Sequence, residues 1–167
     1  RGAEIVVKIF ENQWFINFGD NEWKKLAHEN IDNAIIIPRE LRQEFHNVVD
    51  WLREKACARK AGLGTPLPWE PEWTIEALSD SVIYMAYYTV IKGIKEADPD
   101  PETLTEEFWD YVFLGEGDIK AIAESTSISE EKLRELNKEF NYFYPMDTRH
   151  SGRDLISNHL TYMLFCH

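Results

Sequence analysis

The sequence contains only two cysteines, Cys57 and Cys166. It also has no apolar run that approaches the roughly 20 residues needed to cross a membrane. Two cysteines exclude a framework of several disulfides and a four-cysteine zinc site. The missing apolar run means that no association with a membrane is expected. Together these absences favour a cytoplasmic protein.

Positive charge is also scarce, since 18 lysines and arginines stand against 30 aspartates and glutamates, for a net charge of −12. Stand-alone nucleic-acid binders usually carry a basic face. The basic residues concentrate here at Arg53, Lys55, Arg59 and Lys60. Nucleic acid would therefore be contacted through this patch or by parts outside the chain. The alternative is that the patch is an ordinary solvated helix face.

The usual nucleophile and metal motifs are absent: there is no Gly-x-Ser-x-Gly, no phosphate-binding P-loop and no His-Glu-x-x-His. No catalytic residue and no metal ligand is therefore predicted. Cys57 stands near Lys55 and Arg59, whose charges would lower the pKa of its thiol and make it reactive. A buried structural cysteine is the alternative.

The residues that are present predict one mixed domain with a real core. Alternating patterns predict strands over Ile5–Phe10, Trp14–Asn17 and Thr74–Leu78, with helices between and after them. Asp20 or Asn21 can cap a helix over Glu22–Asn30. Glycines and prolines over Lys60–Trp73 predict an ordered loop without regular structure. The mixture favours an α/β class with an incomplete sheet. Because it starts without methionine and ends on the apolar run Tyr162–His167, the chain is expected to be a piece of a longer protein.

Two segments place a carboxylate and small polar residues where a strand is expected to lead into a helix. The first is Leu78–Ser81, ahead of a helix expected over Ser81–Lys95. The second is Ser151–Asp154, preceded by an extended stretch over Met146–His150. In open α/β sheets, ligands bind at the carboxyl ends of strands and face the positive ends of helices. Asp154 would then accept hydrogen bonds from sugar hydroxyls, and ordinary N-capping is the alternative.

Three further side chains extend these candidate sites. Tyr84 follows Ser81 by one helical turn, so that the two can line one pocket wall. His159 lies further along the helix that begins near Asp154, and His167 follows eight residues later on nearly the same face. The alternative for Tyr84 and for both histidines is packing in the core.

Five blocks of sequence closely resemble leucyl-tRNA synthetases of the archaeal and eukaryotic type. They follow one another in the same order and cover nearly the whole chain, which is far more specific than any single motif. The blocks are Gln13–Ile16, Trp51–Arg59, Gly62–Pro68, Leu78–Tyr88 and Ser151–Leu160.

The resemblance implies a class I aminoacyl-tRNA synthetase, whose Rossmann-type catalytic domain is split by an editing insertion. The chain would follow that insertion, so a partial Rossmann-type domain, its second half, is expected together with a helical connective insertion. Residues 1–50 would be exit strands and connecting helices after the editing insertion. Residues 51–93 and 141–167 would form the second half of the catalytic domain, and residues 94–140 the connective insertion.

The resemblance also implies a function. The family activates leucine with ATP to leucyl-adenylate and transfers leucine to its tRNA, relying on positioning and charge stabilisation. ATP, Mg²⁺, leucine and tRNA(Leu) would be used by the parent enzyme, with no cofactor held tightly by this chain. By motif, Ser81, Tyr84, His159 and His167 would form the leucine pocket, Gly152 and Asp154 would contact the ATP ribose, and Arg53, Arg59 and Lys60 would lie near the tRNA.

The departures from the family are as informative as the matches. Its His-x-Gly-His and Lys-Met-Ser-Lys-Ser phosphate motifs are absent from the chain. The editing insertion, which the family adds because binding alone cannot separate small apolar side chains, is absent too. The isolated chain is therefore expected to be inactive, and exposed apolar edges are expected to favour self-association. Two alternatives stay open: a fragment of an isoleucyl- or valyl-tRNA synthetase, and a non-catalytic acidic binding module.

Overall fold

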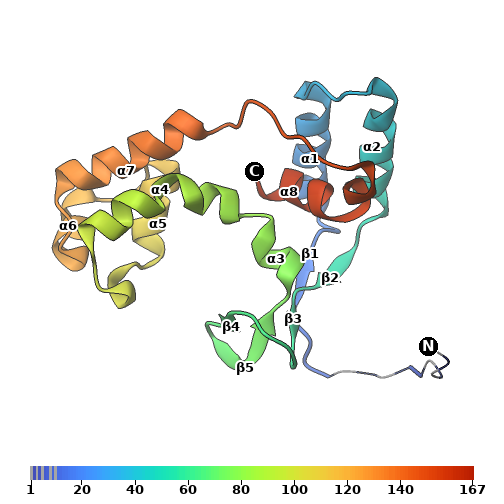
Figure 1. Cartoon of the computed structure of the whole chain (residues 1–167), viewed down its shortest axis with the longest axis horizontal. Coiled ribbons are helices and arrows are strands. Elements are labelled where there is room, and N and C mark those ends of the chain that lie inside the picture. The colour runs from blue at the N-terminus through green and yellow to red at the C-terminus, as the bar shows by residue number, and fades with distance from the viewer. Residues whose placement is uncertain (1, 3, 5, 8, 10) are drawn as a thin grey trace. The chain divides into compact units, whose positions relative to one another are not determined.

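The computed structural model describes residues 2, 4, 6, 7, 9 and 11–167, which form two compact units. The first unit combines Arg1–Val82 with Gly152–Cys166, and the second is Ile83–Ser151 with His167. Helices and small sheets are both present, which confirms the α/β class (Figure 1). Among the described residues, no helix is long and apolar enough to cross a membrane. The strand predicted over Ile5–Phe10 rests on residues outside this set.

The strands of the first unit form two small antiparallel sheets. In one sheet β1 pairs with β2, and in the other β5 lies between β3 and β4. The strand predicted over Trp14–Asn17 is confirmed as β1. All pairs in the described part of the chain are antiparallel, so the parallel sheet expected of a Rossmann-type half is not seen there. The strands are β1 (Phe15–Asn17), β2 (Glu54–Ala56), β3 (Ala58–Arg59), β4 (Pro66–Leu67) and β5 (Glu70–Ile75).

The prediction of an irregular loop over Lys60–Trp73 is wrong, because β4 and most of β5 lie within it. The prolines fit these strands. Pro66 belongs to β4, at the edge of its sheet, and Pro71 lies where the register between β4 and β5 shifts. Edges and bulges are the positions where a missing N–H is tolerated in a sheet.

The helices of the first unit pack closely: α1 lies against α2 and α8, and α2 lies against η4. α1 begins as the sequence predicts, since the Trp23 N–H donates to the carboxylate of Asp20 at 2.9 Å. The Trp23 indole N–H also donates to the Phe165 carbonyl at 2.6 Å, which fixes α8 to α1. The helical elements are α1 (Asn21–Asn33), the 3₁₀ turn η1 (Arg39–Leu41), α2 (Arg42–Trp51), α3 (Ala77–Ser81), the 3₁₀ turn η3 (Arg153–Leu155), the π-helical turn η4 (Ile156–Leu160) and α8 (Thr161–Cys166).

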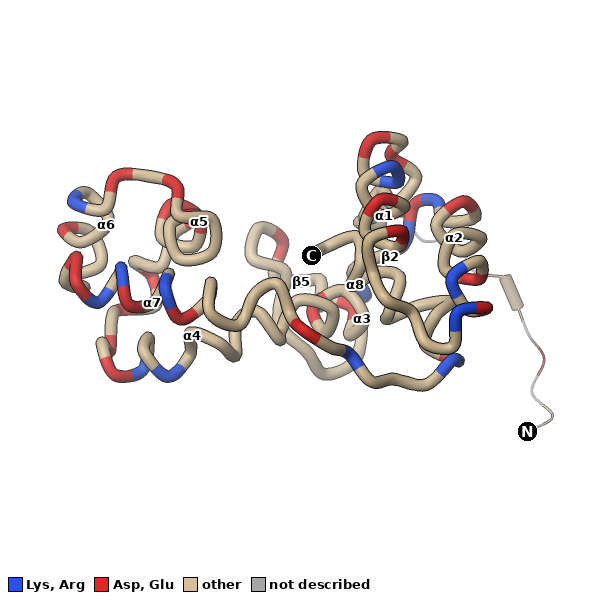
Figure 2. Tube along the Cα trace, turned by 90° about the horizontal axis from the view of Figure 1, so that it is seen from above, with Lys and Arg blue, Asp and Glu red and all other residues tan. Residues whose placement is uncertain are grey.

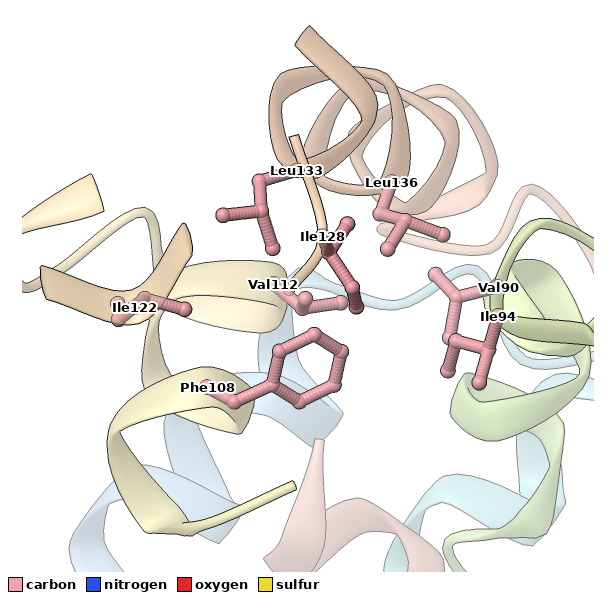
Figure 3. Packing of buried hydrophobic residues seen from close by; sticks show 8 residues of the cluster. All are labelled: Val90, Ile94, Phe108, Val112, Ile122, Ile128, Leu133 and Leu136. Atoms are coloured by element: carbon pink, nitrogen blue, oxygen red, sulfur yellow. The ribbon is translucent and has the colours of Figure 1, made fainter. Parts of the chain in front are cut away.

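The second unit is helical, and α7 packs against α4, α5 and α6. Eight buried aliphatic and aromatic side chains fill the space between these helices (Figure 3). Many acidic residues lie along the same helices (Figure 2). The elements are α4 (Tyr84–Ala97), the 3₁₀ turn η2 (Pro101–Thr103), α5 (Glu106–Leu114), α6 (Ile119–Thr126) and α7 (Glu130–Phe143). The core residues are Val90, Ile94, Phe108, Val112, Ile122, Ile128, Leu133 and Leu136.

Two predictions beside the candidate sites are wrong. Met146–His150 is not a strand, because the described residues offer it no neighbouring strand for hydrogen bonding. The strand predicted over Thr74–Leu78 ends at Ile75, where α3 follows after a single residue. The carboxylate of that residue, Glu76, accepts the N–H of Leu78 at 2.8 Å and caps α3.

Candidate functional site

The structure brings together two of the predicted pocket residues, Ser81 and His159. Nε2 of His159 lies 3.2 Å from the main-chain carbonyl oxygen of Ser81, across 78 residues of sequence. η4 carries His159 and packs against α3, which ends at Ser81. Ser81 therefore closes a helix, and the prediction that it opens one is wrong. Its contribution to this contact is the carbonyl left free at the end of α3.

This contact determines the protonation of the imidazole. A carbonyl oxygen only accepts hydrogen bonds, so Nε2 of His159 must carry the proton and donate it. In the neutral ring Nδ1 is then an acceptor. Nδ1 is buried and has no hydrogen-bond partner in the described structure. A buried acceptor without a partner is costly, so this nitrogen has an unused capacity to accept a hydrogen bond from a donor that reaches it.

Gly152 and Asp154 form the second part of the candidate site, at the start of the helical run that leads to His159. Gly152 is the N-cap of η3, and no side chain caps that turn. The helix start predicted near Asp154 is confirmed. The alternative, N-capping by Asp154, is wrong, because Asp154 is the second residue of the turn and not the residue before it. Its carboxylate is exposed and accepts no hydrogen bond from the described residues.

The missing side chain of Gly152 affects the space around it, whereas its backbone angles set no requirement for glycine. Its φ of −79° and ψ of 149° are open to any residue. A Cβ added at this position would overlap Oδ1 of Asp154. A side chain here would move the exposed carboxylate of Asp154 aside, which this flexible side chain can do at little cost.

Tyr84 and His167 belong to the second unit, whereas the other predicted pocket residues belong to the first. The one-turn spacing predicted between Ser81 and Tyr84 is wrong, since α3 ends at the first and α4 begins at the second. Tyr84 is 38% exposed, so it is not a core residue. Its ring lies 5.1 Å from that of Tyr88, and the ring of His167 stacks on Tyr144 at 5.4 Å.

The basic patch lies on strands and turns, so its interpretation as a helix face is wrong. Arg53 donates to main-chain carbonyls at the end of α2, at 3.0–3.1 Å. The guanidinium of Arg59 donates to the carbonyl of Leu63 at 2.7 Å and closes its own loop. Lys60 forms an ion pair with Glu72 at 3.4 Å. All three predicted tRNA contacts thus make interactions within the chain, and Arg53 and Lys60 are exposed whereas Arg59 is half-buried.

Burial raises the pKa of the Cys57 thiol, which supports the structural interpretation of this cysteine over the reactive one. The thiolate is the nucleophile, so alkylation of Cys57 in the folded chain at pH 8 is expected to be several-fold slower than in the urea-unfolded chain. The stability that the neutral thiol contributes is complete below the pKa of the unfolded thiol and is lost as the pH rises through the folded value. Peptide mass spectrometry after iodoacetamide treatment measures both rates. Equal rates in the folded and unfolded chains would contradict the burial of this thiol.

Two features of the site were missed from the sequence. The capping role of Glu76 was not seen, because glutamate is not among the preferred N-cap residues. The contact between the His159 ring and a main-chain carbonyl leaves no trace in the sequence. For Mg²⁺ the fit is poor: the described residues contain no cluster of three or more His, Cys, Asp or Glu side chains that could hold a metal ion.

The curated proteins that resemble the chain share one name. No family model matches the chain. The chain is 54% identical to a leucine–tRNA ligase of Pyrobaculum islandicum, 55% identical to one of Pyrobaculum arsenaticum, and 54% identical to leucine–tRNA ligase 2 of Metallosphaera sedula. Each alignment covers 99% of the chain but only 18% of the relative. These names do not favour an isoleucyl- or valyl-tRNA synthetase or a non-catalytic module. The chain is therefore homologous to a segment of the archaeal leucine–tRNA ligases.

Proposed function

We propose that the chain is part of the catalytic domain of an enzyme that activates leucine with ATP to leucyl-adenylate and transfers leucine to tRNA(Leu). The observation that carries this proposal is the identity of 52–55% over 99% of the chain to proteins named leucine–tRNA ligase. Geometry supports it as well, because Ser81 and His159 meet in the structure although they lie far apart in the sequence.

Residues 51–93 and 141–167 are proposed as the second half of a Rossmann-type catalytic domain. Residues 1–50 are proposed as exit strands and connecting helices, and residues 94–140 as a helical connective insertion. The proposed insertion is supported by the helical core of the second unit, in which α5, α6 and α7 pack together. α4, which lies mainly before residue 94, packs on the same core. A parallel Rossmann-type sheet that includes residues 51–93 and 141–167 would have to be completed by residues outside the chain.

ATP would supply the adenylyl group that activates the carboxylate of leucine. Asp154 is suited to bind the ribose, because its exposed carboxylate can accept two hydroxyl hydrogen bonds and is not used for capping. Gly152 keeps the space that this carboxylate occupies. The role of both residues is to orient the nucleotide, and no proton transfer is assigned to them.

The residues proposed to contact leucine in the parent enzyme are Ser81, Tyr84, His159 and His167. Nδ1 of His159 would accept a hydrogen bond from a donor on the aminoacyl group, since Nε2 is held by the Ser81 carbonyl. The exposed ring of Tyr84 would supply apolar surface. Arg53, Arg59 and Lys60 are proposed to lie near the tRNA, and Arg53 and Lys60 are exposed. Exposed apolar residues such as Ile35 and Trp51 make self-association of the isolated chain part of the proposal.

The isolated chain is expected to show no leucine-dependent exchange of pyrophosphate into ATP, because it lacks both phosphate-binding motifs of the family. A full-length ligase that contains this segment is expected to catalyse the exchange with leucine and to discriminate against isoleucine and valine. Exchange assays with the three amino acids measure both. Activity of the isolated chain would refute its proposed inactivity, and a full-length enzyme that prefers isoleucine or valine would refute the proposed substrate.

A further inference from the structure

Four side chains on α1 and α2 form an unbroken chain of hydrogen bonds, outside the site described above. Nδ1 of His28 lies 2.7 Å from Nδ1 of His46. Nε2 of His28 lies 3.0 Å from Oδ1 of Asp50, and Nε2 of His46 lies 3.1 Å from Oδ1 of Asp32. This Asp50–His28–His46–Asp32 sequence of contacts is called the histidine relay below. Its imidazoles are 29% and 19% exposed, whereas its carboxylates are 70% and 66% exposed.

The two imidazoles of the relay meet edge to edge. Their ring centroids are 5.0 Å apart and their planes differ by 20°. The centroid separation equals the distance between the two nitrogens plus one ring radius at each end, so the nitrogens lie on the line between the rings. A lone pair and an N–H on that line form a straight hydrogen bond. A metal ion bound by both nitrogens would need more room and a bent arrangement, which argues for a proton between them.

The hydrogen bonds fix the number of protons on the two imidazoles, and therefore their charge. Each Nε2 faces a carboxylate, which only accepts, so both Nε2 atoms carry a proton. One Nδ1 must donate to the other, which requires a third proton. Three protons on four nitrogens make one imidazolium and one neutral imidazole. We propose that His28 and His46 share a single extra proton, and that this proton clamps α1 to α2 in a pH-dependent way.

Other charged groups contact the two aspartates of the relay, through a carboxylate or the main chain. The guanidinium of Arg42 lies 3.9 Å from Asp32, and the ammonium of Lys24 donates to the main-chain carbonyl of Asp50 at 2.9 Å. The guanidinium of Arg53 donates to the same carbonyl at 3.1 Å. Three other titratable side chains on neighbouring elements make contacts away from the relay: Arg153 of η3 pairs with Glu44, His159 of η4 contacts Ser81, and Tyr162 of α8 stacks on Phe18. No described contact joins the relay to the side chains of Arg39 and Glu40 of η1 or Cys166 of α8.

The direction of the pH dependence follows from the proton count. When the pH falls, a fourth proton leaves two N–H groups and two positive charges facing each other at 2.7 Å, so the bond between the rings is lost. When the pH rises, the two imidazoles keep only two protons. Three hydrogen bonds (between the two rings, and from each ring to its aspartate) then share two N–H donors, so one of these bonds is lost. The clamp is therefore strongest between these limits. Because α1 and α2 both pack against α8, the clamp also supports the helical run that carries His159.

Nuclear magnetic resonance of the ¹⁵N-histidine-labelled 167-residue chain tests the shared proton. A scalar coupling between Nδ1 of His28 and Nδ1 of His46 is expected near neutral pH and is expected to vanish on acidification. Two independent titrations without coupling at any pH between about 5 and 9 would overturn the proposal. Stoichiometric zinc-induced shifts of both rings at micromolar zinc would also overturn it, because they would assign the pair to a metal.

A double-mutant cycle of His28→Gln and His46→Gln provides the second measurement. The coupling between the two positions in the unfolding equilibrium constant is expected to reach roughly tenfold near neutral pH, as for a hydrogen bond to a charged group. It is expected to fall on both sides of that pH. His150→Gln, which changes a histidine outside the relay, is the matched control and is expected to leave the profile unchanged. A coupling that does not vary with pH would contradict the shared proton even if both variants fold normally.

Discussion

Replacing Asp154 by Ala in a full-length leucine–tRNA ligase that contains this segment is expected to lower kcat/KM for ATP in leucine activation by roughly tenfold to a hundredfold, the range that a charge-assisted hydrogen bond contributes. The expected loss follows from the exposed carboxylate, which no described residue binds and which does not cap η3. The KM for leucine is expected to change little, because Asp154 is proposed to contact the ribose. Initial rates of pyrophosphate exchange at varied ATP and leucine measure these constants.

Two further variants separate nucleotide binding from a structural role. Asp154→Asn keeps the shape and most of the helix-start preference but loses the charge, so it is expected to retain stability and still bind ATP more weakly. Asp147→Ala removes another exposed carboxylate and is the matched control, with kinetics expected to equal those of the unaltered enzyme. Unchanged kinetics for both Asp154 variants would remove this residue from the proposed nucleotide site. A lower melting temperature for Asp154→Ala alone would point to the helix start.

The candidate site shows what a sequence can and cannot predict. The helix start near Asp154 was predictable, since glycine and small polar residues precede a run with helical spacing. The position of Ser81 was not, because Glu76 caps α3 earlier than the preferred capping residues would have suggested. The meeting of His159 with the Ser81 carbonyl depends on tertiary packing between η4 and α3. Local propensity carries no information about such a contact.

The same division holds for the fold. α1 followed from Asp20 and the spacing after it, and β1 followed from alternation. The strands within Lys60–Trp73 could not be predicted, because prolines normally indicate the end of regular structure. Only the structure places them at a sheet edge and at a register shift, where they are tolerated. Pairing partners are set by long-range contacts, so the antiparallel arrangement of both sheets was not available from the sequence. The excess of acidic residues predicts a charged surface for the second unit, but it does not tell which apolar side chains meet in the core.

That core gives the prediction with the largest expected effect on stability. Phe108 on α5 is fully buried and lies among the eight core side chains between α4, α5, α6 and α7 (Figure 3). Phe108→Ala is expected to lower the free energy of unfolding of the second unit by about 3–5 kcal/mol, from lost burial and the cavity that remains. A domain of this size is typically stable by only about 5–15 kcal/mol, so the variant is expected to lose much of its helical signal at moderate urea.

Phe143 provides the matched control, because it is a phenylalanine of the same unit whose side chain is 48% exposed. Phe143→Ala is expected to cost less than about 1 kcal/mol, since a surface truncation leaves no cavity. Phe108→Leu, which keeps most of the volume, is expected to fall between the two. Urea unfolding followed by far-ultraviolet circular dichroism ranks the three variants. Equal losses for Phe108→Ala and Phe143→Ala would mean that α5 does not pack on α7 as described, and the helical core would then be incorrect.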